Sequence, residues 1–475
     1  MTDQRPLFPT AARALRWIGR LLRRLARPLL LLLLALVIVH LTATVITGVM
    51  LKREVARIKA RGEPLRPIDM VEKLPPRTPN AADIYRQAFN ALRLSQQERE
   101  QVVAANADYL GVDDPKKLEG HVALARKVIA ANDDYFRLLE KASRLPAVSF
   151  PVKWEDPINV LLPHYAKLRD AARLLVVRAK LNLMEGRVDA AAEDCATIFR
   201  IADHAGRDPV LLGCLVSYAI HQTGLQQLEE VLSAGDPSQA VCHQLLQQLS
   251  AIDNRARFAR AMLGERAMGS AAFEQLLRLP ADAAGVLDPE HPRRLVLPLR
   301  LYLTLGRPLL NLDELAYYRF MEEVIAAAAL AYPQSKEGAE AACNTLDHLP
   351  VYRSLLSRQI MPVYTRAVEC TETDTAVIGA GRLAVGLRLY RYQHGRYPAS
   401  LDALAQPGEK LPLDPFVQKP YHYRTEGNGF AIWSVGPDLE DNHATEPEGT
   451  YRWATSSPGP EATKLHADLV FRVAR

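Results

Sequence analysis

The stretch Leu29–Leu51, LLLLLLALVIVHLTATVITGVML, determines the architecture that we predict for this chain. It contains no acidic or basic residue, and its polar members are His40 and three threonines. A helix of this length spans about 34 Å, which exceeds the roughly 30 Å hydrocarbon core of a bilayer. We therefore predict a transmembrane anchor over residues 28–51.

Such a segment is either a cleaved signal peptide or a permanent anchor. The region before it is 27 residues long, and the nearest small-residue cleavage site, Thr42-Ala43-Thr44, matches the A-x-A pattern poorly. We favour the uncleaved anchor.

The net charge of +5 is concentrated in the first 27 of the 475 residues. This tail carries seven arginines and Asp3, a charge of +6, and the rest of the chain has a charge of −1. The body therefore lacks the excess of basic groups that nucleic acid requires, and no nucleic-acid partner is expected. Its composition, 48% hydrophobic and 24% charged, is that of a globular protein.

The orientation of the anchor depends on its two flanks. Six lysines or arginines lie within 15 residues on either side, so the positive-inside count is tied. Long C-terminal parts are translocated largely regardless of charge. The tail arginines recur at helical spacing and form either an amphipathic helix on the anionic leaflet or a solvated charge run. Both interpretations place the basic tail, residues 1–27, in the cytoplasm and residues 52–475 outside the cytoplasmic membrane.

The five cysteines favour neither a zinc site nor a disulfide framework. They are widely spaced, and no CxxC occurs. One or two disulfides could form in an oxidising compartment, but small buried residues within helices are the simpler interpretation. The cysteines are Cys195, Cys214, Cys242, Cys343 and Cys370.

Residues 52–79 are predicted to be a linker, which begins with a short basic helix and continues with five prolines. Residues 80–365 show helical spacing of apolar positions and predict an all-α bundle. Asn80 has N-cap character. Further helices are expected near 115–143, 209–233, 236–278 and 312–332.

The clearest helical pair is Tyr165–Met184 and Val188–His204, separated by a tight turn. Ala179, Gly186 and Ala191 resemble positions of a tetratricopeptide unit, but no clear second copy occurs at a period of about 34 residues. An ordinary αα-hairpin of a bundle is the alternative.

A second apolar stretch, LVLPLRLYLTLGRPLL at 295–310, contains two arginines and two prolines, which argue against another membrane span. We predict irregular segments packed into the bundle. Contact with a partner or with the membrane surface is the alternative.

Residues 366–475 have the pattern of a small α+β domain. A helix is predicted from Arg366 to Tyr392, ended by Gly395, and a short one over Leu401–Ala405, capped by Ser400. Strands are predicted at 421–424 and 430–434, joined by a hairpin turn, and at 451–454 and 469–473.

Five segments of this domain share their order and spacing with a known family. They are LYRYQHGRYP at 389–398, SLDAL at 400–404, LPLDPF at 411–416, PYHY at 420–423 and FAIWSVGPD at 430–438. Together they resemble the globular part of the major pseudopilin of type II secretion systems, over about residues 366–450. The resemblance implies a long helix against a small antiparallel sheet, and after the sheet a loop that binds calcium.

The matching loop is acidic, and hard oxygen ligands on one loop suit Ca²⁺. We predict Asp438, Asp441 and Asn442 as its ligands. Glu440 and His443 in the same loop would instead suit a transition metal. A solvated acidic loop is the third interpretation.

The chain also departs from the pseudopilin pattern. Its anchor lies more than 300 residues upstream of the domain, and the leader cleavage motif is absent. Polar residues Thr371–Asp374 stand where the apolar membrane helix of a pseudopilin would continue. The resemblance therefore implies a fold, an extracytoplasmic location and an association with secretion or pilus-like machinery, rather than a polymerising subunit.

No P-loop, dinucleotide fingerprint, HExxH or GxSxG motif occurs. We predict a non-catalytic scaffold or interaction protein of the bacterial envelope, held in the cytoplasmic membrane through Leu29–Leu51, with envelope or secretion proteins as partners. The alternatives are an envelope enzyme with a motif-less site in the helical domain and a divergent secretion-system subunit. An enzyme requires a cavity with convergent polar groups of perturbed pKa, whereas a scaffold requires an exposed apolar or repeat-built groove.

Overall fold

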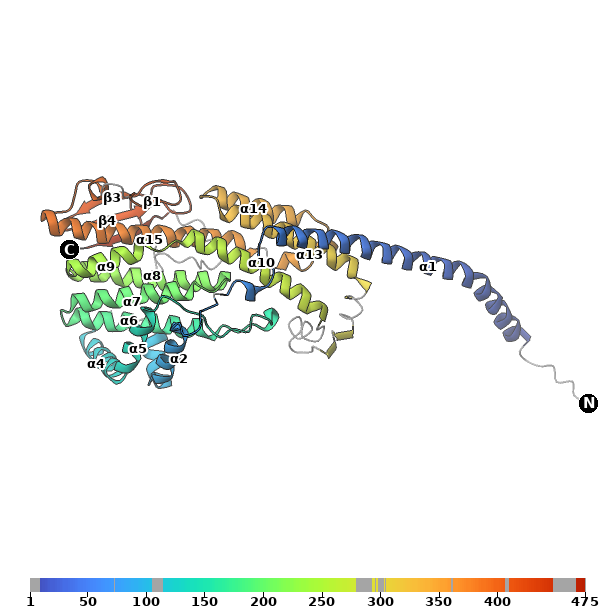
Figure 1. The fold of residues 1–475 in the computed structure, drawn as a ribbon, viewed down its shortest axis with the longest axis horizontal. Coiled ribbons are helices and arrows are strands. Elements are labelled where there is room, and N and C mark those ends of the chain that lie inside the picture. Colours follow the sequence, from blue (N-terminus) through green and yellow to red (C-terminus); the bar gives the residue numbers. More distant parts are fainter. Residues whose placement is uncertain are drawn as a thin grey trace, which may run out of the picture.

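The computed structural model describes residues 9–71, 73–104, 114–278, 293–294, 296–297, 303, 305–359, 362–405, 410–446 and 467–474. The molecule is mainly helical, with 70% helix, a small antiparallel sheet at the C-terminus and one apolar N-terminal helix. Figure 1 shows an elongated body from which the N-terminal helix projects at one end, with the C-terminus at the other.

The α-helices are α1 (Pro9–Ala60), α2 (Ala81–Ala91), α3 (Gln96–Glu98), α4 (Pro115–Ala131), α5 (Asp133–Ser143), α6 (Pro163–Met184), α7 (Val188–Ala205), α8 (Leu211–Ala234), α9 (Gln239–Ser250), α10 (Asn254–Arg278), α13 (Arg307–Ala328), α14 (Gln334–Asp347) and α15 (Pro362–His394). Short 3-10 or π segments are η1 (Pro67–Asp69), η2 (Arg99–Ala104), η4 (Pro157–Asn159), η5 (Val351–Arg353), η6 (Ser357–Gln359) and η7 (Leu401–Leu404). The strands are β1 (Leu413–Asp414), β2 (Lys419–Pro420), β3 (His422–Glu426), β4 (Gly429–Ser434) and β5 (Leu469–Val473).

The predicted anchor and the basic helix after it form one continuous helix, α1, with Pro28 in its interior. The large apolar side chains from Leu29 to Val39 are 45–66% exposed, so the protein itself does not cover them. In the part of the chain that the structure describes, α1 is the one helix long and apolar enough to cross a bilayer. It is compatible with a membrane anchor, as the sequence predicts.

The predicted helical pair is confirmed as α6 and α7. Gly186 in the turn between them has φ of 73°, a left-handed conformation that glycine adopts without steric cost. Ala179 and Ala191 are completely buried where the two helices approach. The tetratricopeptide interpretation of this hairpin stays a prediction.

Two of the predicted long helices are each divided in two. The segment 115–143 breaks at Asn132, whose side-chain amide donates to the carbonyls of Val128 and Arg93 and accepts from the Arg93 N–H. These bonds compete with the continuation of the helix. The segment 236–278 is likewise interrupted at 251–253, between α9 and α10. Helix α14 was not among the predicted helices.

The C-terminal elements have the predicted order. The hairpin pairs β3 with β4 through a two-residue turn, with Glu426 opposite Gly429, and β5 pairs with β4 at the predicted residues 469–473. Helix α15 ends at Gly395, whose φ is 72°. Residues 401–404 form a 3-10 helix in which the Ser400 side chain makes no capping bond. The strand predicted at 451–454 lies outside the described residues.

The body is layered, as Figure 1 shows: α6, α7 and α8 lie side by side, α15 lies beyond α8 and α9, and the sheet covers α15. One hydrophobic core contains Phe199 of α7, Leu225 of α8, Ala384 of α15 and Phe430 of β4. The predicted domain boundary at residue 366 falls inside α15. The segments on either side of this boundary therefore share a core.

Candidate functional site: the junction between helix α1 and the body

At the C-terminal end of α1 the chain reverses direction and turns back along the body. Backbone hydrogen bonds hold this turn. Gly62, with φ of 71°, donates from its N–H to the Lys59 carbonyl at 3.0 Å, and Glu63 N–H reaches the Ile58 carbonyl at 3.4 Å. This is the Schellman arrangement, with glycine at the left-handed position. It places Glu63 beside α10, on which η1 also packs.

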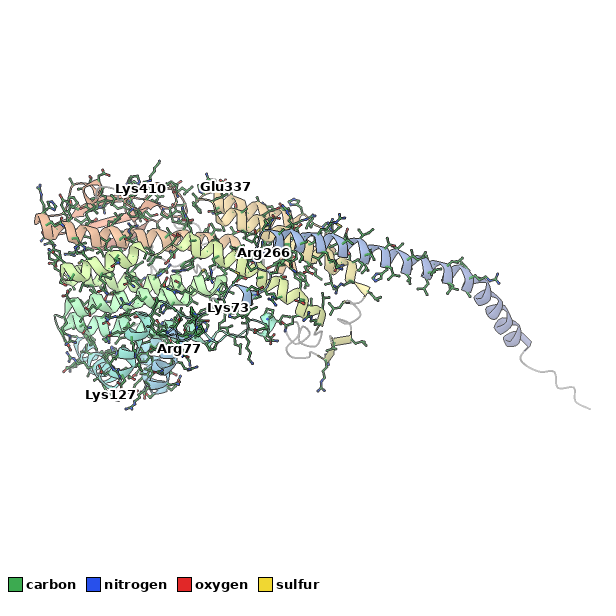
Figure 2. The ribbon with its side chains drawn as sticks, in the orientation of Figure 1. Lys73, Arg77, Lys127, Arg266, Glu337 and Lys410 are labelled. Carbon is green, nitrogen blue, oxygen red and sulfur yellow. The ribbon has the colours of Figure 1, made fainter. Side chains whose placement is uncertain are left out.

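Ion pairs join the C-terminal end of α1 to helices α10 and α13 of the body. Glu63 contacts the guanidinium of Arg266 on α10 at 2.5 Å, and that arginine is 1% exposed. Figure 2 shows Arg266 where α1 meets the body. Glu322 of α13 binds Arg61 at 2.8 Å and lies 3.4 Å from Arg57. Burial raises the pKa of the Glu63 carboxyl, but the hydrogen bonds from Arg61 and Arg266 outweigh it, and its pKa is lowered.

A seam along α1 continues this contact into the apolar segment. Partly or fully buried positions recur every three or four residues at His40, Ala43, Thr44, Thr47, Gly48, Leu51, Val55 and Ile58. Within the seam, Asn311 Nδ2 of α13 donates to Thr47 Oγ1 at 3.1 Å. Small residues and interhelical amide bonds of this kind are typical of helix contacts inside membranes.

Helix α13 runs beside α1 in the same direction. Asn311 contacts Thr47, and eleven residues further along α13 Glu322 contacts Arg57 and Arg61 of α1. The two helices therefore advance together along the same axis. Figure 1 shows α1 crossing alongside α13. The first turn of α13, which begins at Arg307, therefore lies beside the apolar segment rather than beyond it.

Next to the seam is an open cavity of about 1010 Å³ bordered by α1, the 62–70 segment, α10 and α13. Its apolar lining includes Leu51, Val55, Leu65, Leu263 and Leu277. Its polar lining consists of Lys59, Glu63, Arg66, Asp69, Ser270, Glu274, Arg307, Glu314 and Tyr318. Its volume is that of a small-molecule site, and polar side chains make up about half of its lining.

The most perturbed acid of the cavity is Glu314. Burial raises the pKa of its carboxyl to about 7, against a hydrogen bond from the Tyr318 hydroxyl and the nearby charge of Arg307, both of which lower it. The Tyr318 hydroxyl is also within 2.6 Å of Ser270 Oγ. Glu314 therefore changes charge near neutral pH.

No residue of this cavity was among the predicted site residues. It is built from three stretches of sequence, near 51–70, 263–277 and 307–318, none of which carries a motif. A faint sequence signal exists, because Arg307 comes after a strongly apolar run without an acidic neighbour. Of the 295–310 stretch, residues 295, 298–302 and 304 lie outside the described residues. The prediction of irregular segments is wrong for Arg307–Leu310, which form the first turn of α13.

The three predicted calcium ligands lie together in one loop. Asn442 Nδ2 donates to Asp438 Oδ2 at 3.2 Å, and Asp441 Oδ1 accepts from Trp433 Nε1 and from the His443 N–H, both at 2.9 Å. Burial raises the pKa of the Asp441 carboxyl, but these two hydrogen bonds outweigh it and lower it. Among the described residues, no group of three or more His, Cys, Asp or Glu side chains is arranged to hold a metal. The calcium site stays a prediction.

The polar residues at 371–374 have partners inside the body. Asp374 Oδ2 lies 2.7 Å from His221 Nδ1 of α8 and accepts from Asn254 Nδ2 of α10 at 2.8 Å. Arg255 contacts both oxygens of Glu372, and Tyr218 contacts Thr371. His221 and Asp374 are completely buried, so this pair lies inside the protein and joins α15 to α8.

All five cysteines are free, and four of them are buried. Burial raises the pKa of Cys214 to about 12 and that of Cys242 to about 11, so both stay thiols near neutral pH. This agrees with their interpretation as small buried residues.

Comparison of the chain with protein-family models, with curated protein sequences and with solved structures finds no match. The geometry of the junction is therefore the basis for a functional assignment.

Proposed function

We propose that this protein is a scaffold or interaction protein of the bacterial envelope, anchored by α1 in the cytoplasmic membrane with its body outside. The observation that carries the proposal is the packed junction between α1 and the body. The Thr47–Asn311 hydrogen bond and the Glu322 and Glu63 ion pairs join a membrane-length helix to the body without a flexible linker. Such a joint holds a large helical surface at a set distance and angle from the bilayer.

The topology can be tested on spheroplasts. Protease added outside is expected to digest residues 80–475, and carbonate washing is expected to leave α1 in the membrane. Protection of the body in intact spheroplasts, with digestion after lysis, would place it in the cytoplasm and contradict the proposal.

The resemblance to pseudopilins supports a place near secretion or pilus-like machinery. Helix α15 lies against an antiparallel sheet of order β3-β4-β5, which is the arrangement that the resemblance implies. Cross-linking in native membranes and subsequent mass spectrometry are expected to recover envelope partners through this part of the chain. Recovery of cytoplasmic proteins alone would argue against it.

An envelope enzyme is the second candidate, because the junction cavity combines a concave site with an acid of perturbed pKa. Glu314, Tyr318 and Ser270 lie within one hydrogen-bonded group at its wall. If the cavity is catalytic, Glu314→Gln abolishes turnover of its substrate while leaving binding intact. If the protein is a scaffold, the same variant leaves partner recovery unchanged.

A further inference from the structure

We propose that the body makes a second contact with the bilayer, through the 349–357 segment, beside the point where α1 leaves the membrane. In this contact Val351, Tyr352 and Leu355 lie in the interfacial layer, against the lipid. The inference rests on that part of the proposed function in which α1 crosses the bilayer. It adds a surface of the body whose partner is a lipid surface.

The 349–357 segment exposes a cluster of apolar side chains. Val351, Tyr352 and Leu355 are 56%, 58% and 42% exposed and fall within five consecutive residues. Single exposed apolar side chains are ordinary on the surface of a soluble protein, whereas a cluster of them marks contact with a partner or a membrane. The position of the segment relative to α1 decides between these two.

Asp313 of α13 fixes the level of the 349–357 segment. Its buried carboxylate accepts hydrogen bonds from two backbone N–H groups and one hydroxyl of the segment, at 2.6–3.2 Å. Asp313 comes two residues after Asn311, a rise of about 3 Å along the helix. Because Asn311 is bonded to Thr47 of α1, the segment is attached close to the level of Thr47.

The level of Thr47 corresponds to an edge of the hydrocarbon core. Arg27 is the last charged residue before the apolar run, so the opposite edge lies close to it. A core of about 30 Å takes roughly 20 helical residues, which places the second edge near Thr47. The 349–357 segment therefore lies where the hydrocarbon gives way to the headgroup layer. Tyrosine is enriched at this depth, as Tyr352 requires.

A fourth exposed apolar side chain lies on the membrane side of this level. Leu305 comes just before the first turn of α13 and is 67% exposed. It precedes Asn311 by six residues, so it lies about 9 Å nearer to the middle of the bilayer. Figure 1 shows the start of α13 at the end of the body from which α1 projects. Lipid contact makes the exposure of this leucine favourable.

The backbone of the 349–357 segment is suited to a layer that is poor in water. The N–H groups of Arg353 and Ser354 bond to carbonyls three residues earlier, at 2.8 and 3.2 Å. The guanidinium of Arg358 donates to the Leu349 carbonyl at 2.5 Å. Polar groups that are satisfied within the protein lower the cost of placing a backbone against lipid.

The test adds one tryptophan to the full chain, either as Tyr352→Trp or, as the control, as Leu413→Trp. Leu413 on β1 is 49% exposed, and β1 lies toward the end of the body remote from α1 (Figure 1). Each variant and the natural chain are reconstituted in phosphatidylcholine vesicles, with or without bromine on the acyl chains near the glycerol. Subtracting the fluorescence of the natural chain removes the signal of its four tryptophans.

Bromine is expected to quench the added fluorescence of Tyr352→Trp at least about twofold, because interfacial side chains reach the first acyl carbons. It is expected to leave that of Leu413→Trp unchanged. Leu355→Trp is a second reporter, and all three variants should keep the natural melting temperature because the replaced side chains are exposed. Quenching at residue 352 or 355, with none at 413, supports the inference. No quenching at both 352 and 355, or equal quenching at 413, overturns it.

Carbonate extraction of the same vesicles separates this inference from the proposed function. A chain that stays in the membrane without quenching at residues 352 and 355 contradicts the interfacial contact alone. A chain that carbonate extracts contradicts the anchor and the contact together. Protease accessibility reports which side of the membrane the body occupies, and the contact is the same on either side.

Discussion

Asn311 of α13 donates a hydrogen bond to Thr47 of α1 across 3.1 Å, which joins residues 264 positions apart in the chain. Thr47 is buried although it belongs to the apolar segment, and its hydroxyl also donates to the Ala43 carbonyl one turn earlier. The body of the protein is therefore attached to the apolar segment of α1 itself, in addition to its attachment at the end of α1.

Removing this hydrogen bond should loosen the junction. Thr47→Val and Asn311→Leu are each expected to lower the free energy of unfolding by about 1 kcal/mol, the usual size of an interhelical bond in a membrane setting. A double-mutant cycle in bilayer nanodiscs should show coupling of the two changes. Thr42→Val, on the exposed side of the same helix, is the control and should have no effect. Strict additivity of the two variants would show that the bond contributes nothing.

The Glu63–Arg266 ion pair should contribute more to stability than the Thr47–Asn311 hydrogen bond, because Arg266 is almost fully buried. Glu63→Gln leaves the guanidinium without its carboxylate and is expected to cost about 3 kcal/mol. Chemical denaturation of the full chain measures the loss, with the exposed Glu119→Gln as the control. A loss no greater than that of the control would mean that other groups satisfy Arg266.

The buried cluster around Asp374 should hold α15 in place. Asp374→Ala removes the acceptor of both His221 and Asn254 and is expected to destabilise the chain by about 3–5 kcal/mol. The joint replacement of His221 and Asp374 by leucine should recover much of this loss, since no buried charge then lacks a partner. If the single variant unfolds at the same denaturant concentration as the natural chain, the cluster has no structural role.

Glu314 should make stability depend on pH near neutrality. Burial raises its pKa from 4.5 to about 7, so the folded state holds a proton that the unfolded state releases. Its contribution is fully present below pH 4.5 and is lost as the pH rises through 7. The groups that face it are Arg307, Tyr318 and Glu274. The melting temperature of the natural chain should therefore fall relative to that of Glu314→Gln between about pH 5 and 8, and parallel curves would contradict this.

Calcium binding by Asp438, Asp441 and Asn442 remains a prediction with a direct test. Millimolar calcium is expected to raise the melting temperature of the full chain, and Asp438→Asn is expected to abolish the shift. Magnesium is the control ion, because its smaller octahedral shell fits a flexible loop poorly. The absence of any shift would remove the metal assignment and leave the loop held by its own hydrogen bonds.

The sequence by itself determined the features that depend on local interactions. The uninterrupted apolar run 29–51 predicts α1, the spacing of apolar residues predicts α6 and α7, and Gly186 marks the turn between them because it adopts a left-handed conformation. The β3–β4 hairpin was predictable for the same reason, since two residues close its turn.

Only the tertiary structure decided what joins these elements. Asn132 divides a predicted helix because its amide finds backbone partners in Arg93, 39 residues away. Thr371 and Asp374, polar residues whose role the sequence left unexplained, contact side chains of α8 and α10. The junction cavity depends on three distant stretches that meet because α13 lies along α1. These tertiary contacts result from the packing of side chains across the whole chain, and no local sequence pattern predicts them.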